Sequence, residues 1–161
     1  MRKLLIGLFI IVTLLQADDV LFKQGSKSIG INTGTGNLDI GVTKNYYILG
    51  VKGDYFVYDN LSVGIGISVW LGNDPTLIEV NVPVTYYFET DWSIYPYLGL
   101  FYKYSFYNGD YVDLSYNSIG ARAGISYKIR KGYIGVGVVT EYNIDIGENY
   151  INPEIFAGIV F

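Results

Sequence analysis

The feature that most constrains this chain is a period-two alternation of side chains that recurs along most of its 161 residues. In the segment 61–71, Val63, Ile65 and Ile67 fall on one face, and the residues between and beside them are glycine or serine. Successive side chains of a β-strand point to opposite faces, so this is the periodicity of a strand and not of a helix. The pattern predicts eight strands, at about 26–33, 45–57, 61–71, 76–88, 94–106, 117–128, 133–143 and 150–161.

Segments rich in Gly, Asn, Asp and Pro separate these strands and predict hairpin connections. We expect short turns at 58–60, 89–93 and 129–132, and outer loops at 33–44, 72–75, 107–116 and 144–149. Pro83 cannot donate a ladder hydrogen bond, so it predicts a bulge or a distortion in its strand. Eight antiparallel strands joined in this way predict an all-β, up-and-down barrel.

The first residues are not expected to belong to the barrel. Arg2 and Lys3 precede an apolar run from Leu4 to Leu15, which is the pattern of a secretory signal peptide. The run is shorter than the roughly 20 apolar residues of a membrane-spanning helix. We therefore predict a signal peptide at 1–17, cleavage between Ala17 and Asp18, and one barrel domain at 18–161. The segment 18–25 is expected to be a loosely held N-terminus.

Alternation alone does not distinguish a soluble lipocalin-type barrel from a membrane barrel, because each has one apolar and one polar face. A surface that faces water should be rich in Lys, Glu and Asp. Here the polar face holds mainly Gly, Ser and Asn with about one charge per strand, which favours a narrow interior and an apolar exterior in a membrane.

Aromatic residues near the strand ends support the membrane barrel, because such barrels carry aromatic girdles at both interfaces. One girdle is expected to hold Tyr46, Tyr47, Trp70, Tyr104, Phe106, Tyr142 and Tyr150. The other is expected to hold Tyr55, Tyr86, Phe88, Tyr127, Tyr133 and Phe161.

The same register predicts which charges point inward: Lys52, Asp54, Glu79, Lys103, Arg122, Lys128, Glu141 and Glu154. Buried charges must be paired, so we expect a self-neutralising network that fills the barrel. For Arg122, we expect Glu141 and Glu154 as partners, with Glu79 possible across the interior. The alternative is an ion path, although eight strands leave little room for an open channel.

Composition excludes several other functions. The formal net charge of −4 gives no clustered basic surface for nucleic acid. The chain has no cysteine, so it needs no disulfide. It has no histidine, which is the commonest general base and metal ligand, so we predict no enzyme, cofactor or metal site.

The mature chain resembles small eight-stranded outer-membrane barrels of Gram-negative bacteria, such as outer membrane protein X and the transmembrane domain of outer membrane protein A. The resemblance rests on the leader, the eight alternating strands and the final aromatic residue, Phe161. It implies an outer-membrane location, contact with membrane lipids and a monomer, and it implies that Phe161 is part of the signal read by the insertion machinery. The barrel enzymes of that membrane use a catalytic His, which is absent here.

We therefore predict an integral outer-membrane protein of structural or surface-interaction type, whose surface partner the sequence does not identify. The outer loops carry acidic residues at Asp39, Asp74, Asp110, Asp113, Asp145 and Glu148, which are either solvated or in contact with a divalent cation or a partner at the cell surface. The alternative is a narrow pore or a ligand-binding barrel, embedded in the membrane or soluble.

Overall fold

The structure is a computed structural model that describes residues 21–39, 43–72, 76–108 and 115–161. The strands are β1 (Lys27–Asp39), β2 (Thr43–Tyr58), β3 (Leu61–Leu71), β4 (Thr76–Tyr87), β5 (Ile94–Asn108), β6 (Ser115–Ile129), β7 (Gly132–Asn143) and β8 (Glu148–Val160). Within the described ranges, no helix has the length and hydropathy needed to cross a membrane. The predicted leader and its cleavage site at Ala17 and Asp18 lie outside these ranges.

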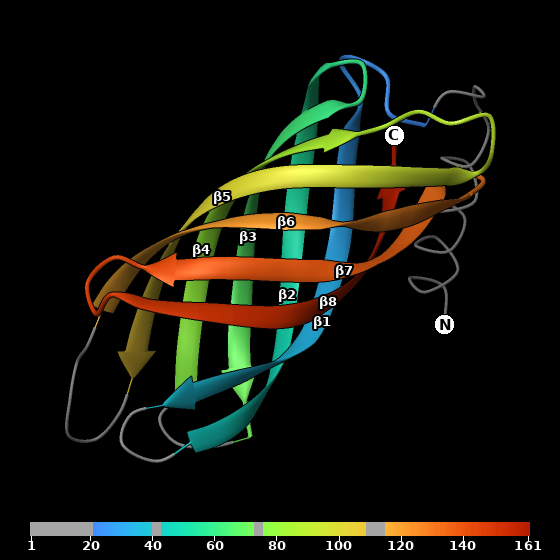
Figure 1. Cartoon of the computed structure of the whole chain (residues 1–161). Coiled ribbons are helices and arrows are strands. Elements are labelled where there is room, and N and C mark those ends of the chain that lie inside the picture. The colour runs from blue at the N-terminus through green and yellow to red at the C-terminus, as the bar shows by residue number, and fades with distance from the viewer. Residues whose placement is uncertain (1–20, 40–42, 73–75, 109–114) are drawn as a thin grey trace, which may run out of the picture.

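Each strand pairs antiparallel with the next, and β8 returns to pair with β1, so the sheet closes into an up-and-down barrel. Figure 1 shows β5 to β8 crossing in front of β1 to β4. The predicted all-β fold with eight hairpin-connected strands is confirmed.

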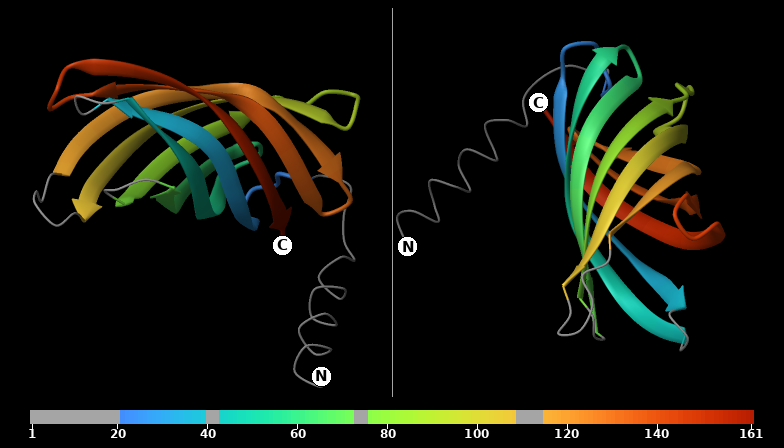
Figure 2. Two further views of the ribbon diagram at one scale, coloured as in Figure 1. Left: turned by 90° about the horizontal axis from the view of Figure 1, so that it is seen from below. Right: turned by 90° about the vertical axis from the view of Figure 1, so that its left-hand side faces the viewer.

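The two ends of the barrel differ in what they carry. The terminal rim comprises the segment 21–26, the turns at 59–60, 88–93 and 130–131, and the C-terminus. Figure 2 shows the C-terminus at the same end as the segment that leads into β1. The loop rim is the opposite end, where β1, β3, β5 and β7 end and β2, β4, β6 and β8 begin.

The predicted loop at 33–44 is wrong, because β1 continues to Asp39 and β2 already begins at Thr43. Thr33 and Thr35 continue the outward alternation and lie opposite Leu49 and Tyr47 in the ladder. Threonine is a good strand former, so the Gly- and Thr-rich composition of this segment did not end the strand. The predicted loop at 107–116 is also too long, because β5 ends at Asn108 and β6 begins at Ser115.

The exterior of the barrel is apolar, and the interior is polar or aromatic. Ile65 is 58% exposed, whereas its neighbour Gly66 and the nearby Ser68 are buried. We call the outward apolar residues at mid-strand the exterior belt: Ile29, Ile31, Leu49, Val51, Ile65, Ile67, Leu98, Leu100, Ile119, Ile125, Val136, Val138 and Ile155. A soluble monomer rarely exposes so large an apolar surface, whereas a transmembrane barrel requires it. The fold is therefore that of a transmembrane barrel, and the soluble lipocalin-type alternative is wrong.

Aromatic side chains lie near both ends of the exterior belt, as predicted, but four of the predicted girdle residues belong to the inward register: Tyr46, Trp70, Tyr133 and Tyr150. Tyr46, Trp70 and Tyr133 are buried in the barrel. They belong to the inward register of their strands, so proximity to a strand end was not sufficient to place them outside. Among the described residues, the exposed aromatics toward the loop rim are Tyr47, Tyr102, Tyr104 and Tyr142. Those toward the terminal rim are Tyr55, Tyr58, Tyr86, Phe88, Trp92, Tyr127 and Phe161.

Pro83 interrupts the ladder between β3 and β4, as predicted. Pairing stops after Val63 opposite Val84 and resumes at Gly66 opposite Asn81, without a change of register. The missing N–H of proline therefore produces a local gap and not a bulge. A register shift occurs instead near the end of β2, between Phe56 and Tyr58.

The N-terminal segment is not loosely held, contrary to the prediction. Phe22 is fully buried in the terminal rim. Its ring stacks on those of Tyr87 and Phe56, with distances between ring centroids of 4.1 Å and 5.2 Å. The carbonyl of Phe22 accepts a 2.7 Å hydrogen bond from the backbone N–H of Asn60 in the turn between β2 and β3. The segment thus closes the terminal rim of the barrel with an aromatic side chain.

Candidate functional site in the barrel interior

The charged side chains of the interior form three clusters, and alternation along the strands explains why they meet. On each strand, every second residue points inward, so charges separated by an even number of positions share the interior. Seven of the eight charges predicted to face inward are members of these clusters: Lys52, Asp54, Glu79, Lys103, Arg122, Glu141 and Glu154. The eighth, Lys128, is half-buried near the terminal rim, one residue before the end of β6.

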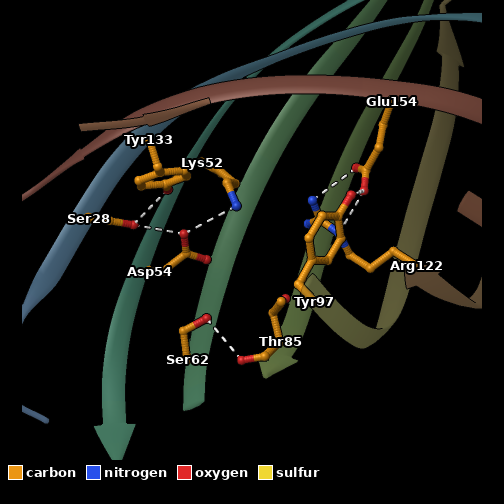
Figure 3. A network of polar contacts seen from close by, with 9 residues as sticks. All are labelled: Ser28, Lys52, Asp54, Ser62, Thr85, Tyr97, Arg122, Tyr133 and Glu154. Atoms are coloured by element: carbon orange, nitrogen blue, oxygen red, sulfur yellow. Dashed lines mark hydrogen bonds and ion pairs between the residues drawn. The ribbon is translucent and has the colours of Figure 1, made fainter. Parts of the chain in front are cut away.

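The first cluster lies nearest the terminal rim and is centred on Asp54 (Figure 3). Ser28 of β1 donates a 2.9 Å hydrogen bond to Asp54 Oδ2 and shares a 3.2 Å hydrogen bond with the hydroxyl of Tyr133. Lys52 Nζ lies 3.4 Å from the same carboxylate oxygen, but it makes no hydrogen bond. It lies instead 4.9 Å from the centre of the Phe156 ring. Lys52 is therefore buried with an incomplete set of partners.

The second cluster pairs Arg122 of β6 with Glu154 of β8 through two contacts (Figure 3). Nη2 lies 2.9 Å from Oε2, and Nε donates a 3.1 Å hydrogen bond to Oε1. Tyr97 of β5 donates a 2.6 Å hydrogen bond to the same Oε1. The guanidinium also lies 5.3 Å from the ring centres of both Tyr97 and Phe156. Such paired, bidentate geometry is what a buried arginine requires.

The third cluster places Lys103 of β5 between two carboxylates. Its Nζ lies 2.7 Å from Glu79 of β4 and 2.5 Å from Glu141 of β7. Lys103 reaches Glu141 across β6, where the intervening inward residues are the small Ser118 and Gly120. Lys103 therefore bridges strands on both sides of its own.

The predicted partners of Arg122 are partly correct. Glu154 pairs with Arg122 as expected, whereas Glu79 and Glu141 both pair with Lys103. The reason is the stagger of the barrel, which brings Glu141 level with Lys103 instead of Arg122.

Aromatic rings fill the space between the clusters and the terminal rim. They form one group with the N-terminal segment, consisting of Leu21, Phe22, Phe56, Tyr87, Tyr95, Tyr97, Tyr133, Phe156 and Val160. Inward glycines make room for them: a Cβ atom on Gly158 would lie 2.6 Å from the Tyr133 ring. The sequence did not predict the burial of Phe22, because an isolated Leu-Phe pair in a polar segment carries no periodicity.

A cavity of about 100 Å³ remains among the clusters. Its wall includes Lys52, Arg122 and Lys103, and it reaches the β1–β8 seam at Gly34 and Pro153. A water molecule occupies about 30 Å³ in the liquid, so the space holds roughly three waters or one small polar group. In the part of the chain that the structure describes, no group of three or more metal-binding side chains occurs.

The acidic residues of the loop rim are only partly described. Asp74, Asp110 and Asp113 lie outside the described residues, as does the side chain of Asp39. Asp145 accepts a 2.6 Å hydrogen bond from the backbone N–H of Asn117, so it ties the last hairpin to β6. Glu148 accepts a 2.6 Å hydrogen bond from Tyr150. Both carboxylates thus have partners within the rim.

The C-terminal residue is fixed to the first strand. Phe161 and Lys27 exchange two backbone hydrogen bonds of 2.9 Å, and the Phe161 ring is half exposed beside the terminal rim. The ring is therefore available at the membrane interface.

The sequence matches no protein-family model and no curated protein sequence. The fold is similar to that of several solved barrels. Neisserial surface protein A is 15% identical over 85% of this chain and 96% of its own, with a TM-score of 0.64. The outer membrane protein OprG from Pseudomonas aeruginosa is 14% identical over 89% of this chain and 99% of its own, also with a TM-score of 0.64. The attachment invasion locus protein Ail of Yersinia pestis is 17% identical over 86% of this chain and 99% of its own, with a TM-score of 0.56. That structure is of Ail in complex with the heparin analogue sucrose octasulfate.

The chain therefore has the fold of the small eight-stranded outer-membrane barrels, as the sequence resemblance implied. The outer membrane is the location that fits both this fold and the exterior belt.

Proposed function

We propose that this protein is a non-conducting outer-membrane barrel of structural or surface-interaction type, with the terminal rim in the periplasm. The observation that carries the proposal is the obstruction of the interior. Three charge clusters lie in the barrel interior, and Phe22 packs in its terminal rim. An eight-stranded barrel has room for little more than its own side chains, so no continuous water column is expected. The absence of histidine from the chain also supports a role without catalytic turnover.

Conductance in planar lipid bilayers tests the non-conducting role. Purified, refolded protein is expected to give no stable open-channel current, with a general porin in the same preparation as the control for insertion. Long-lived, ion-selective channels that disappear when Lys103 or Arg122 is replaced would contradict the proposal and favour the pore.

The charge of the loop rim supports a surface partner of a particular kind. Ail, which has this fold, binds a sulfated sugar analogue. In the present chain, the loop-rim connections and their edges carry six acidic residues: Asp39, Asp74, Asp110, Asp113, Asp145 and Glu148. Charge complementarity therefore favours a cationic partner over a polyanion.

Labelling of intact cells tests the orientation. A peptide tag inserted between Ile146 and Gly147 should bind antibody on intact cells, because it lies on the loop rim. A tag inserted between Arg130 and Lys131 should bind only after the outer membrane is permeabilised. The reverse pattern would contradict the proposed orientation.

A further inference from the structure

The β1–β8 seam is only half closed, and the interior cavity reaches the place where it opens. Pairing runs from Ser28 opposite Val160 to Gly34 opposite Glu154. Beyond that point, β1 pairs only with β2, and β8 pairs only with β7, within the residues that the structure describes. Figure 1 shows the two strands separating toward the loop rim. The barrel therefore has one incomplete wall in its loop-rim half.

Pro153 explains why the ladder stops there. Its carbonyl oxygen points at Gly34 of β1, as the carbonyl of Ala157 points at Gly30 earlier in the ladder. In an antiparallel ladder, the N–H and C=O of one residue face the same neighbour. The edge of Pro153 that faces β1 thus has an acceptor but no donor, so the ladder lacks a hydrogen bond at the position where pairing ends.

Two hollows of opposite character lie on the two sides of β1 at this seam. Inside lies the cavity of about 100 Å³, lined by Lys52, Arg122 and Glu154 among others. Outside lies an apolar groove of about 600 Å³ across the exterior belt, lined by Ile31, Leu49, Ile134, Val136, Ile155 and Ala157 among others. Asn32 and Thr33 of β1 line both hollows.

Lys52 identifies the chemistry that the inner hollow can accept. Its side chain is 5% exposed, lines the cavity and makes no hydrogen bond. Lys103 and Arg122, the other cavity-lining cations, are each bonded to carboxylates at 3.1 Å or less. Its ion-pair partner, Asp54 Oδ2, lies 3.4 Å away without forming a hydrogen bond, so a further oxygen acceptor in the cavity would stabilise the buried ammonium.

We propose that the seam is a binding site for a single-chain alkyl carboxylate. The carboxylate enters the cavity and accepts hydrogen bonds from Lys52, and the alkyl chain leaves past the last β1–β8 pair, Gly34 opposite Glu154, and lies in the apolar groove. The small cavity admits a carboxylate but not a sugar or a large phospholipid head group. The inference shares with the proposed function only the placement of the barrel in a membrane.

Quenching of Trp70 fluorescence tests the site, because Trp70 lines the cavity. The chain has two tryptophans, so Trp92→Phe, which changes an exposed rim residue, leaves Trp70 as the single reporter. The folded protein is placed in phosphatidylcholine nanodiscs and titrated with 2-bromododecanoate. Saturable quenching at one equivalent is expected, and 12-bromododecanoate should quench much less because its bromine lies in the groove. Unlabelled dodecanoate should displace the probe, whereas dodecanol and dodecyltrimethylammonium should not.

Two variants separate binding from folding. Lys52→Met should weaken dodecanoate binding at least tenfold, whereas Lys27→Met, at an exposed lysine of the terminal rim, should leave it unchanged. Pro153→Val restores the missing N–H, so it should extend the seam and weaken binding at least tenfold without lowering stability. Weaker binding without a loss of stability is not expected from structural damage.

The outcomes that overturn the inference are distinct from failure of the proposed function. A folded, membrane-inserted protein without saturable quenching overturns the site alone. Equal binding of dodecanol, or unchanged binding in both Lys52→Met and Pro153→Val, also overturns it. Failure to insert into the nanodisc would instead contradict the proposed function.

Discussion

The Arg122–Glu154 pair is the single contact whose loss should cost most, because both groups are buried and joined by two short contacts. Arg122→Leu leaves the Glu154 carboxylate without its cation and should lower the free energy of unfolding by about 3 kcal/mol. Urea unfolding in lipid vesicles measures the change. The double variant Arg122→Leu/Glu154→Leu should recover most of the loss, because no unpaired charge remains. An unchanged stability in the single variant would show that the pair is not buried.

Inward glycines should be sensitive to even one added carbon, because aromatic rings lie directly over them. In Gly158→Ala, the new Cβ would lie 2.6 Å from atoms of the Tyr133 ring, so overpacking should cost about 1–3 kcal/mol. Gly53, on the outward face of β2, provides the control, because its nearest neighbour would lie 3.8 Å from an added Cβ. Gly53→Ala should change stability by less than about 0.5 kcal/mol. Equal losses in the two variants would contradict the packing described for the interior.

The N-terminal segment is an element in its own right, although it precedes the first strand. Phe22→Ala removes a fully buried ring that contacts Phe56, Tyr87, Tyr95 and Tyr133, and should cost about 3–5 kcal/mol. The adjacent exposed residue supplies the control, so Lys23→Ala should have little effect on the urea midpoint. A Phe22→Ala variant as stable as the parent would show that the segment does not close the rim.

The alternation of each strand predicted which residues point inward, because a period of two leaves only one choice once one residue is fixed. Lys103 and Arg122 were therefore placed inside from the sequence, whereas their partners depended on the stagger between strands that are far apart in the chain. The strand at Thr33–Asp39 was missed, because its polar composition is compensated by pairing with β2. Phe22 was missed because only the closed barrel creates the pocket that buries it.

The whole molecule has an apolar exterior belt around a charged interior, an arrangement that suits a lipid environment and not water. Ile65→Arg, in the middle of the belt, places a charge in the hydrocarbon and should cost about 2–4 kcal/mol. Folding in vesicles, followed by heat-modifiable mobility on a gel, measures the loss. Ser93→Arg, at an exposed position in a rim turn, should fold like the parent. Equal folding of the two variants would place Ile65 outside the hydrocarbon.

The accessibility of a spin label at residue 65 tests the central claim most directly. The chain has no cysteine, so Ile65→Cys gives a single labelling site, and Glu89→Cys gives an exposed control in the terminal rim. In lipid vesicles, the label at residue 65 should be relaxed by oxygen, which concentrates in hydrocarbon, and protected from a water-soluble nickel chelate. The label at residue 89 should show the reverse. Strong relaxation of the residue 65 label by the nickel chelate, or protection from both reagents, would contradict a lipid-facing exterior.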